Sequence, residues 1–89
     1  MKRAHMIVKG SVQGVSFRSF THSVANNLSI NGWVKNLPQG AVEIIAEGDD
    51  DKIEKFISEI KQGPSASQVD DVIIEWEDPK GDKEFKILI

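Results

Sequence analysis

Apolar residues in this chain alternate between the two-residue spacing of strands and the three-to-four-residue spacing of helices, and the order of these segments sets strong limits on the fold. Apolar residues at every second position predict a strand around residues 4–9, and apolar residues at steps of three and four predict a helix over about residues 17–28. Two further strands are predicted, from Ile30 to Asn36 and from Ala41 to Glu47. The turn between them contains Pro38 and Gly40, so we expect these two strands to form a hairpin.

The second half of the chain continues the alternation. A clear helical repeat predicts a helix from about Asp50 to Gln62, which Gly63 and Pro64 should end. The acidic run 49–51 lacks the ligand spacing of a calcium loop, so we expect it to cap this helix, with Asp51 and Glu54 as a capping box. A fourth strand is predicted from Val69 to Trp76, and residues 85–89 form a last strand after a turn at 79–82.

The predicted order is strand, helix, strand, strand, helix, strand, followed by an extra strand. Each strand–helix–strand unit needs a right-handed crossover, and two interleaved units form the ferredoxin-like split β-α-β sandwich. We therefore predict the α+β class, with one mostly antiparallel sheet and two helices on one face. A chain of 89 residues is sized for one domain, which we expect to span residues 1–89.

Composition narrows the classes of partner. The 11 Lys and Arg residues against 14 Asp and Glu give a net charge of −3, which argues against broad nucleic-acid binding. The chain has no cysteine, so neither a disulfide nor a thiol nucleophile is available. The apolar stretch after Lys2 and Arg3 is too short for a signal peptide, and no segment has the apolar length of a membrane helix. We expect no membrane partner and a cytoplasmic location.

The segment that joins the first strand to the first helix is the best candidate for a binding site. It contains Gly10 and Gly14, and Arg18 follows in the first helical turn, where a cation is mildly unfavourable. A phosphate held between free backbone amides and Arg18 would account for this placement. The loop has neither Walker nor dinucleotide-binding glycine spacing, so the residues alone leave two interpretations open. One is a phosphate cradle, and the other is an ordinary turn with a solvated arginine.

Other polar and aromatic residues have ordinary structural interpretations. We expect surface positions for His5 and His22, with a supporting role near the loop as an alternative for His22, and we predict no metal site. Trp33 and Trp76 favour sheet or core packing over base stacking, because the RNP pattern of RNA-binding domains is missing. By local sequence, Asn36 is typical of a turn asparagine. No Ser–His–Asp or Cys–His pairing indicates covalent catalysis.

Two longer motifs resemble the signatures of the acylphosphatase family. The first is GSVQGVSFR from Gly10 to Arg18, and the second is GWVKN from Gly32 to Asn36, followed by GAV at 40–42 and a glycine at 48. The similarity continues through residues 63–64 to 85–87, so it covers essentially the whole chain. The chain departs from the family at Ser11, commonly arginine, and at residues 37–38, where many members have Thr or Ser after the asparagine. We expect these departures to affect substrate affinity more than the chemistry.

The resemblance implies hydrolysis of small acyl phosphates to a carboxylate and phosphate, without a metal or cofactor. It implies that Arg18 holds the phosphate and that Asn36 holds the attacking water. The implied phosphate-binding residues are Gln13, Gly14, Val15, Ser16, Phe17 and Arg18. We expect phosphate or sulfate to bind as product or inhibitor, and we expect a monomer. Two alternatives remain: a carbamoyl-phosphate-acting relative of the hydrogenase-maturation domain, and a non-catalytic ferredoxin-like binding module.

Overall fold

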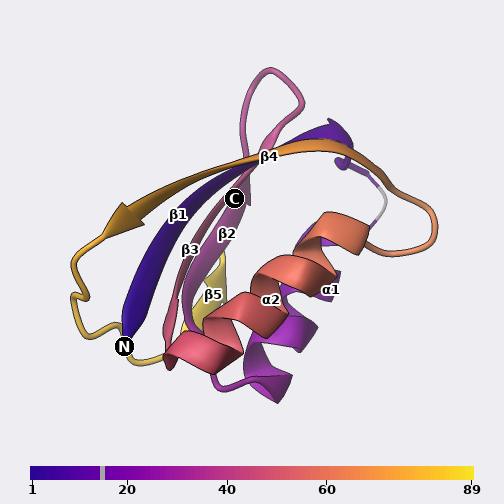
Figure 1. The fold of residues 1–89 in the computed structure, drawn as a ribbon. Helices are drawn as coiled ribbons and strands as arrows, with labels where there is room; N and C mark the ends of the chain where they lie inside the picture. The colour runs from indigo at the N-terminus through magenta and orange to yellow at the C-terminus, as the bar shows by residue number, and fades with distance from the viewer. Residues whose placement is uncertain (15) are drawn as a thin grey trace.

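The computed structural model describes residues 1–14 and 16–89, and its helices and strands follow the predicted order (Figure 1). The elements are β1 (Lys2–Ser11), α1 (Phe17–Asn27), β2 (Asn31–Asn36), β3 (Val42–Gly48), α2 (Asp50–Gln62), β4 (Gln68–Glu77) and β5 (Phe85–Ile87). Neither helix in the described part of the chain is long and apolar enough to cross a membrane.

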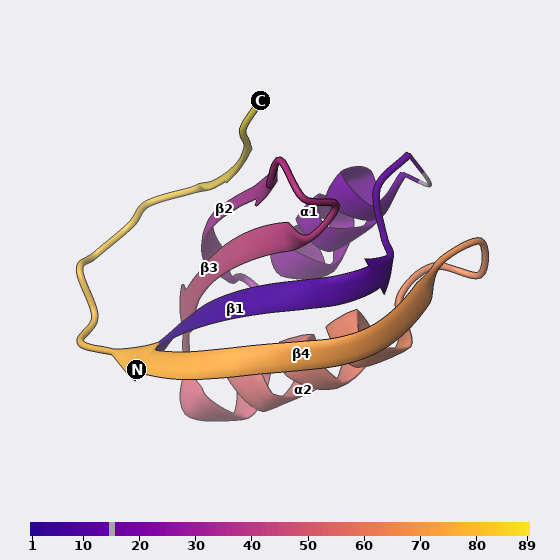
Figure 2. The same cartoon turned by 90° about the horizontal axis from the view of Figure 1, so that it is seen from above.

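The strands form one sheet in the order β4-β1-β3-β2-β5. Every neighbouring pair is antiparallel except β2 and β5, which are parallel. Both helices lie on one face of this twisted sheet, and the other face carries no helix of the described residues (Figures 1 and 2). The predicted α+β class and ferredoxin-like split β-α-β arrangement are therefore confirmed.

The core lies between the sheet and the two helices. Strand residues at every second position point toward the helices, and the helices present one apolar stripe each. Burying one Ile or Phe side chain completely contributes roughly 1.5–3 kcal/mol, so this layer supplies most of the folding free energy. Its largest fully buried apolar side chains are Phe17, Phe56, Met6, Ile30, Ile44, Ile53, Ile60, Val8, Val12, Val34 and Val42.

Strand β1 is longer than predicted and takes Gly10 out of the loop. The strand runs to Ser11 because it pairs with β4 as far as Gln68, with a register shift between Lys9 and Gly10. Gly10 has φ 132°, and a Cβ there would collide with the Gln68 carbonyl. Gly10 is therefore required for close strand pairing, and the binding loop begins after it.

The predicted capping box at the start of α2 is wrong. The helix begins at Asp50, so Asp49 is the N-cap, and its side chain makes no capping hydrogen bond. Asp50 and Asp51 instead lie in the first turn, where their negative charges complement the helix dipole. The predicted end of α2 is confirmed, with Gly63 as its C-cap at φ 68°. Lys61 lies in the last turn, where its positive charge complements the helix dipole.

Candidate active site

The loop between β1 and α1 presents free backbone amides at the start of the helix. Gly14 and the N-cap residue Ser16 both have left-handed conformations, with φ 74° and 61°. For a serine this conformation costs about 1–2 kcal/mol, so its surroundings must hold it. The Ser16 side chain makes no capping hydrogen bond, and the Phe20 amide donates to the Ser16 carbonyl at 3.0 Å. The amides of residues 17–19 therefore have no partner within the helix.

A small pocket lies at this helix start. It has a volume of about 140 Å³. Among the lining residues that the structure describes, Arg18 is the charged one. Its guanidinium and the free amides of the helix N-terminus give the pocket a positive potential suited to an anion. The lining consists of Val12, Gly14, Ser16, Phe17, Arg18, Ser19, Asn36 and Ile87.

Arg18 is held at the pocket by the C-terminal segment. Its Nη1 donates a hydrogen bond to the Leu88 carbonyl at 2.9 Å. The Leu88 amide in turn donates to the Val34 carbonyl of β2 at 2.8 Å, so the segment that follows β5 links the arginine to strand β2. A guanidinium has five N–H donors, so further donors remain for an anion.

Asn36 comes to the same pocket from the end of β2, where it pairs with Val42 of β3. Its Oδ1 is buried and accepts no hydrogen bond from any residue that the structure describes. An unsatisfied buried acceptor costs about 1–3 kcal/mol, and buried polar atoms nearly always have a partner. The oxygen is therefore placed to accept a hydrogen bond from a small donor such as water.

The side chain of Gln13 is directed to the β2–β3 hairpin. Its Nε2 donates to the Leu37 carbonyl at 2.7 Å and to the Ala41 carbonyl at 2.8 Å, and Gln13 is not among the residues that line the pocket. Of the residues predicted to bind phosphate, Gly14, Ser16, Phe17 and Arg18 do line it. Val15 lies outside the described residues.

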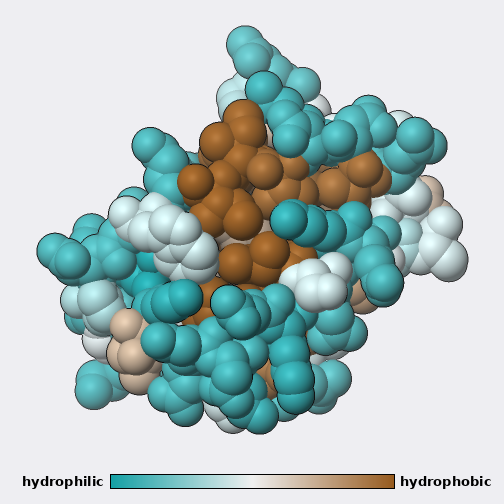
Figure 3. Space-filling model, in the orientation of Figure 1, coloured by the Kyte–Doolittle hydropathy of each residue, from teal (hydrophilic) through white to brown (hydrophobic). Residues whose placement is uncertain are grey.

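The loop, the hairpin and the C-terminal segment meet at one end of the molecule. In Figures 1 and 2 the start of α1 and the β2–β3 turn lie at the end of the sheet away from the N-terminus, and the Leu88 carbonyl of the C-terminal segment accepts the hydrogen bond from Arg18 there. Figure 3 shows a hydrophobic area bordered by hydrophilic side chains in the region where Figure 1 places the C-terminus. Ile87, which lines the pocket, is 42% exposed. The pocket thus combines a polar interior with an apolar rim.

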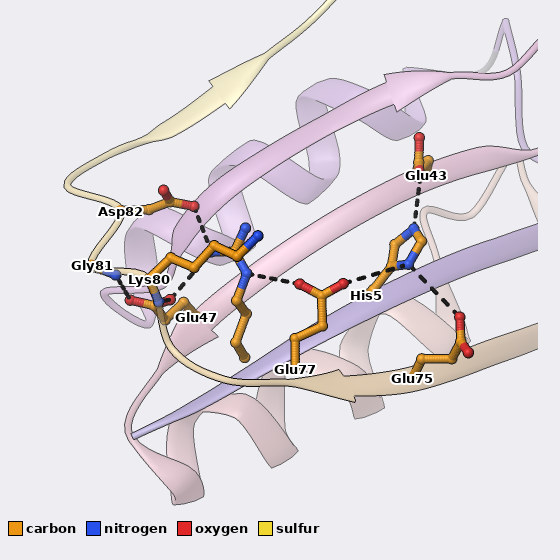
Figure 4. Close-up of polar contacts among 9 residues, drawn as sticks. His5, Glu43, Glu47, Glu75, Glu77, Lys80, Gly81 and Asp82 are labelled. Carbon is orange, nitrogen blue, oxygen red and sulfur yellow. Dashed lines mark hydrogen bonds and ion pairs between the residues drawn. The ribbon is translucent and has the colours of Figure 1, made fainter.

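The helix-free face of the sheet carries a charge network that sequence analysis missed. Arg3 and Glu47 are each only 5% exposed, and their Nη1 and Oε1 atoms are 3.2 Å apart. Arg3 also donates to Asp82 at 2.8 Å and to Glu77 at 3.1 Å (Figure 4). Burial acts to lower the pKa of the Arg3 guanidinium, but these three carboxylates outweigh it and raise that pKa.

Glu47 is anchored by backbone as well as by Arg3. Its carboxylate accepts hydrogen bonds from the amides of Lys80 at 2.7 Å and Gly81 at 2.9 Å (Figure 4). Burial acts to raise the pKa of the Glu47 carboxyl, but the two amides and Arg3 outweigh it and hold the pKa below its usual value. The network therefore fixes the 78–82 turn to the sheet and stabilises the fold.

His5 and Trp76 differ from the predictions made for them. His5 is half-buried, and its Nε2 lies 2.7 Å from Glu43 Oε2, so it is not a plain surface histidine (Figure 4). Trp76 is 54% exposed, with Lys2 Nζ 5.1 Å from its ring centre. It therefore lies on β4 with a surface cation–π contact, so of the expected sheet or core packing the core position is wrong. Half-buried Trp33 lies on β2, with Lys35 Nζ 5.3 Å from its ring centre.

A second cavity, of about 600 Å³, is a poorer candidate for an anion site. The carboxylates of Glu47, Asp49 and Asp82 border it, together with Lys52 and Lys83. Its mixed charges lack the concentrated positive potential of the pocket at Arg18. In the described part of the chain, no three or more His, Cys, Asp or Glu residues are grouped so that they could hold a metal ion.

Comparison with known proteins gives consistent matches over the whole chain. The family model for Acylphosphatase matches residues 4–87. An acylphosphatase of Thermococcus kodakarensis is 43% identical over 86 residues, covering 97% of this chain and 94% of the relative. The crystal structure of acylphosphatase from Bacillus subtilis has a TM-score of 0.97 and 37% identity, with full coverage of both chains. Full-length HypF in its phosphate- and nucleotide-bound form has a TM-score of 0.84 and 35% identity, over 99% of this chain but 12% of HypF.

Proposed function

This chain belongs to the acylphosphatase family and is an acylphosphate phosphohydrolase, and we propose that the pocket between α1 and the end of β2 is its catalytic site. The observation that carries this proposal is the meeting of two groups there. Arg18 supplies positive charge, and the buried Oδ1 of Asn36 lacks a donor among the described residues. A bound phosphate and an attacking water need these two functions, respectively.

The phosphate binds at the start of α1. Backbone amides of residues 13–18 donate to its oxygens. The Arg18 guanidinium, next to the C-terminal segment, donates to the phosphate as well. Support comes from the free amides that precede Phe20 and from the left-handed turn at Gly14 and Ser16. The planar guanidinium can donate two parallel hydrogen bonds to phosphate oxygens. The hydrogen bond to Leu88 orients it for this contact.

Asn36 positions the nucleophilic water. The water donates one hydrogen bond to Asn36 Oδ1, which aims its lone pair at phosphorus. The bond from the water oxygen to phosphorus forms while the bond from phosphorus to the acyl oxygen breaks, and the electron pair leaves with the carboxylate. The proton of the water passes to a phosphate oxygen of the substrate itself. The carboxylate is a stable leaving group, so charge stabilisation and alignment suffice for this reaction.

The organic part of the substrate lies at the apolar rim of the pocket. Ile87 lines the pocket and is partly exposed, and it lies at the end of β5. An acyl group that leaves the phosphate site on this side covers the Ile87 side chain. Contact with so small an apolar surface favours broad rather than narrow selectivity among acyl groups.

The sequence also supports inferences about domain organisation, oligomeric state, location and cofactors. We infer a single domain over residues 1–89 that acts as a monomer in the cytoplasm, with phosphate or sulfate as inhibiting anions. A chain without cysteine needs no oxidising compartment for its stability. The charge for phosphate binding comes from Arg18 and from backbone amides, so the proposed reaction needs neither metal nor cofactor.

Titration with inorganic phosphate tests where the anion binds. Amide resonances are followed by NMR while inhibition of acyl phosphate hydrolysis is measured on the same preparation, with sodium chloride at matched ionic strength as the control. We expect competitive inhibition, with the largest shifts in residues 13–19 and at Asn36. Noncompetitive inhibition, or shifts confined to the cavity near Glu47 and Asp82, would contradict the proposed site.

A further inference from the structure

The Gln13 side chain joins the loop that follows β1 to the turn between β2 and β3. Gln13 follows β1, and its hydrogen bonds end on Leu37 and Ala41, which flank the turn between β2 and β3. In the sheet, β3 lies between β1 and β2 and pairs with both, so β1 and β2 do not pair with each other. The Gln13 amide therefore provides a link across β3.

The geometry also determines the chemistry of this link. The shared atom lies 2.7 Å and 2.8 Å from two carbonyl oxygens, which only accept hydrogen bonds. It must be the amide nitrogen, because an oxygen there would face two other oxygens without a proton. Both hydrogens of the Gln13 amino group are therefore used, and no other uncharged side chain of similar length offers such a pair of donors.

One of the two acceptors is adjacent to the proposed water-binding residue. Leu37 directly follows Asn36, and the Leu37 amide donates to the Ala41 carbonyl at 2.8 Å. Gln13 thus contacts both residues that flank the β2–β3 turn, next to Asn36 at the end of β2. On its other side, Gln13 precedes Gly14, which lines the pocket.

We propose that Gln13 is a positioning residue, which sets the distance between the phosphate-binding loop and the water held by Asn36. This inference rests on the proposed roles of Arg18 and Asn36. Arg18 and the loop amides belong to one segment, and Asn36 belongs to another, so their separation depends on a contact between the two. A displacement of about 1 Å at a reacting centre costs on the order of 100-fold in rate.

Replacement of Gln13 by methionine tests the link, because methionine keeps the length and removes both donors. Gln39→Met is the matched control, since Gln39 is an exposed glutamine of the same hairpin. The measurements are kcat, KM, the inhibition constant of inorganic phosphate and the thermal midpoint. We expect kcat of Gln13→Met to fall about 10- to 100-fold, with a change in the phosphate inhibition constant of less than about 3-fold. The control should match the wild type.

A double-variant cycle separates positioning from a direct role. If Gln13 acts through Asn36, Gln13→Met combined with Asn36→Ala should be no slower than Asn36→Ala alone. Wild-type kcat in Gln13→Met, or additive losses, would overturn the inference while leaving the role of Asn36 intact. Parallel losses of kcat, phosphate affinity and thermal midpoint would assign Gln13 to the fold alone. Normal turnover by Asn36→Ala would overturn both proposals.

Should Gln13→Met not fold, Gln13→Asn keeps the amide but is one methylene shorter. It can reach at most one of the two carbonyls, so we expect a smaller loss in kcat, about 3- to 10-fold, and the same criteria apply. Wild-type turnover by this folded variant would overturn the inference.

Discussion

Asn36→Ala should separate catalysis from stability. In the proposed mechanism the change removes the acceptor that aligns the attacking water, while Arg18 and the loop amides stay in place. Loss of one preorganised polar group in a catalytic site costs about 10²–10³-fold in kcat. At about 1.4 kcal/mol per tenfold change, this is roughly 3–4 kcal/mol of transition-state stabilisation. The phosphate inhibition constant should change little, because the group acts mainly in the transition state.

The structure also predicts the effect on folding. Asn36 Oδ1 has no hydrogen-bond donor among the described residues, so its removal breaks no hydrogen bond to that part of the protein. Relief of its desolvation, worth about 1–3 kcal/mol, offsets the lost packing of a strand-end side chain. We therefore expect the free energy of unfolding to stay within about 1 kcal/mol of the wild type, which is roughly 4–8 °C in thermal midpoint for a domain of this size.

Asn31→Ala is the matched control from the other end of β2. Asn31 Nδ2 donates to the Asp82 carbonyl at 2.9 Å, far along the strand from the pocket. This variant should lose about 1 kcal/mol of stability and keep its kcat. Both variants are assayed by steady-state hydrolysis of an acyl phosphate and by thermal unfolding. Normal turnover by Asn36→Ala, or loss of its phosphate binding together with its folding, would exclude the proposed role of Asn36 in positioning the water.

Three further predictions concern charge. Arg18→Lys keeps the charge but loses the planar fork, so kcat/KM should fall about 100-fold or more, and a lysine variant with wild-type kcat/KM would exclude bidentate clamping. Glu47→Gln should cost about 2 kcal/mol near pH 7, below the roughly 3–5 kcal/mol of a lone buried pair, because Glu77 and Asp82 still contact Arg3. The folded pKa of Glu47 lies below its ordinary value of 4.5, so its contribution is present above that value and is lost as pH falls through the folded pKa. Denaturant unfolding from pH 7 downward should therefore show a weaker loss in Glu47→Gln, and identical pH profiles would contradict this. Turnover should survive exhaustive treatment with EDTA, because Arg18 and the amides supply the positive charge, and loss restored by a divalent ion would overturn that mechanism.

The elements were predictable where local periodicity and local stop signals agree. Helix α2 has its predicted bounds because its apolar repeat is strong and Gly63 with Pro64 ends it. Strand β1 extends beyond its predicted limits because pairing with β4 continues past the alternating residues. Strand length there depends on pairing of Gly10 with Val69 and of Ser11 with Gln68, almost sixty positions along the chain, which local patterns do not contain.

Long-range polar contacts could not be predicted from the sequence for the same reason. Arg3 and Glu47 are buried together because the register of β1 and β3 places them opposite each other. A register of this kind follows from the whole sheet, so Arg3 near the N-terminus was indistinguishable from a surface cation. The Gln13 link to Leu37 and Ala41 is a similar case, since the motif indicated a polar residue there but not its partners.

For the site itself, the residues alone left the phosphate cradle and an ordinary turn equally open. The family resemblance selected Arg18 and Asn36, and the structure places both at one pocket. Their meeting depends on two different loops and on the C-terminal segment that holds Arg18. No local pattern encodes that convergence, and that Asn36 Oδ1 lacks a donor among the described residues is visible only once the fold is known.

Hydrolysis of benzoyl phosphate in ¹⁸O-labelled water shows directly whether water attacks phosphorus. If a water held by Asn36 attacks phosphorus at the Arg18 pocket, the label should appear in the released phosphate and not in benzoate. Arg18→Lys and Asn36→Ala should slow this labelling without moving it, and a phosphate monoester measured alongside should turn over far more slowly. Label in the benzoate would exclude attack of water on phosphorus, and equal rates in both variants and the wild type would exclude the proposed roles of Arg18 and Asn36.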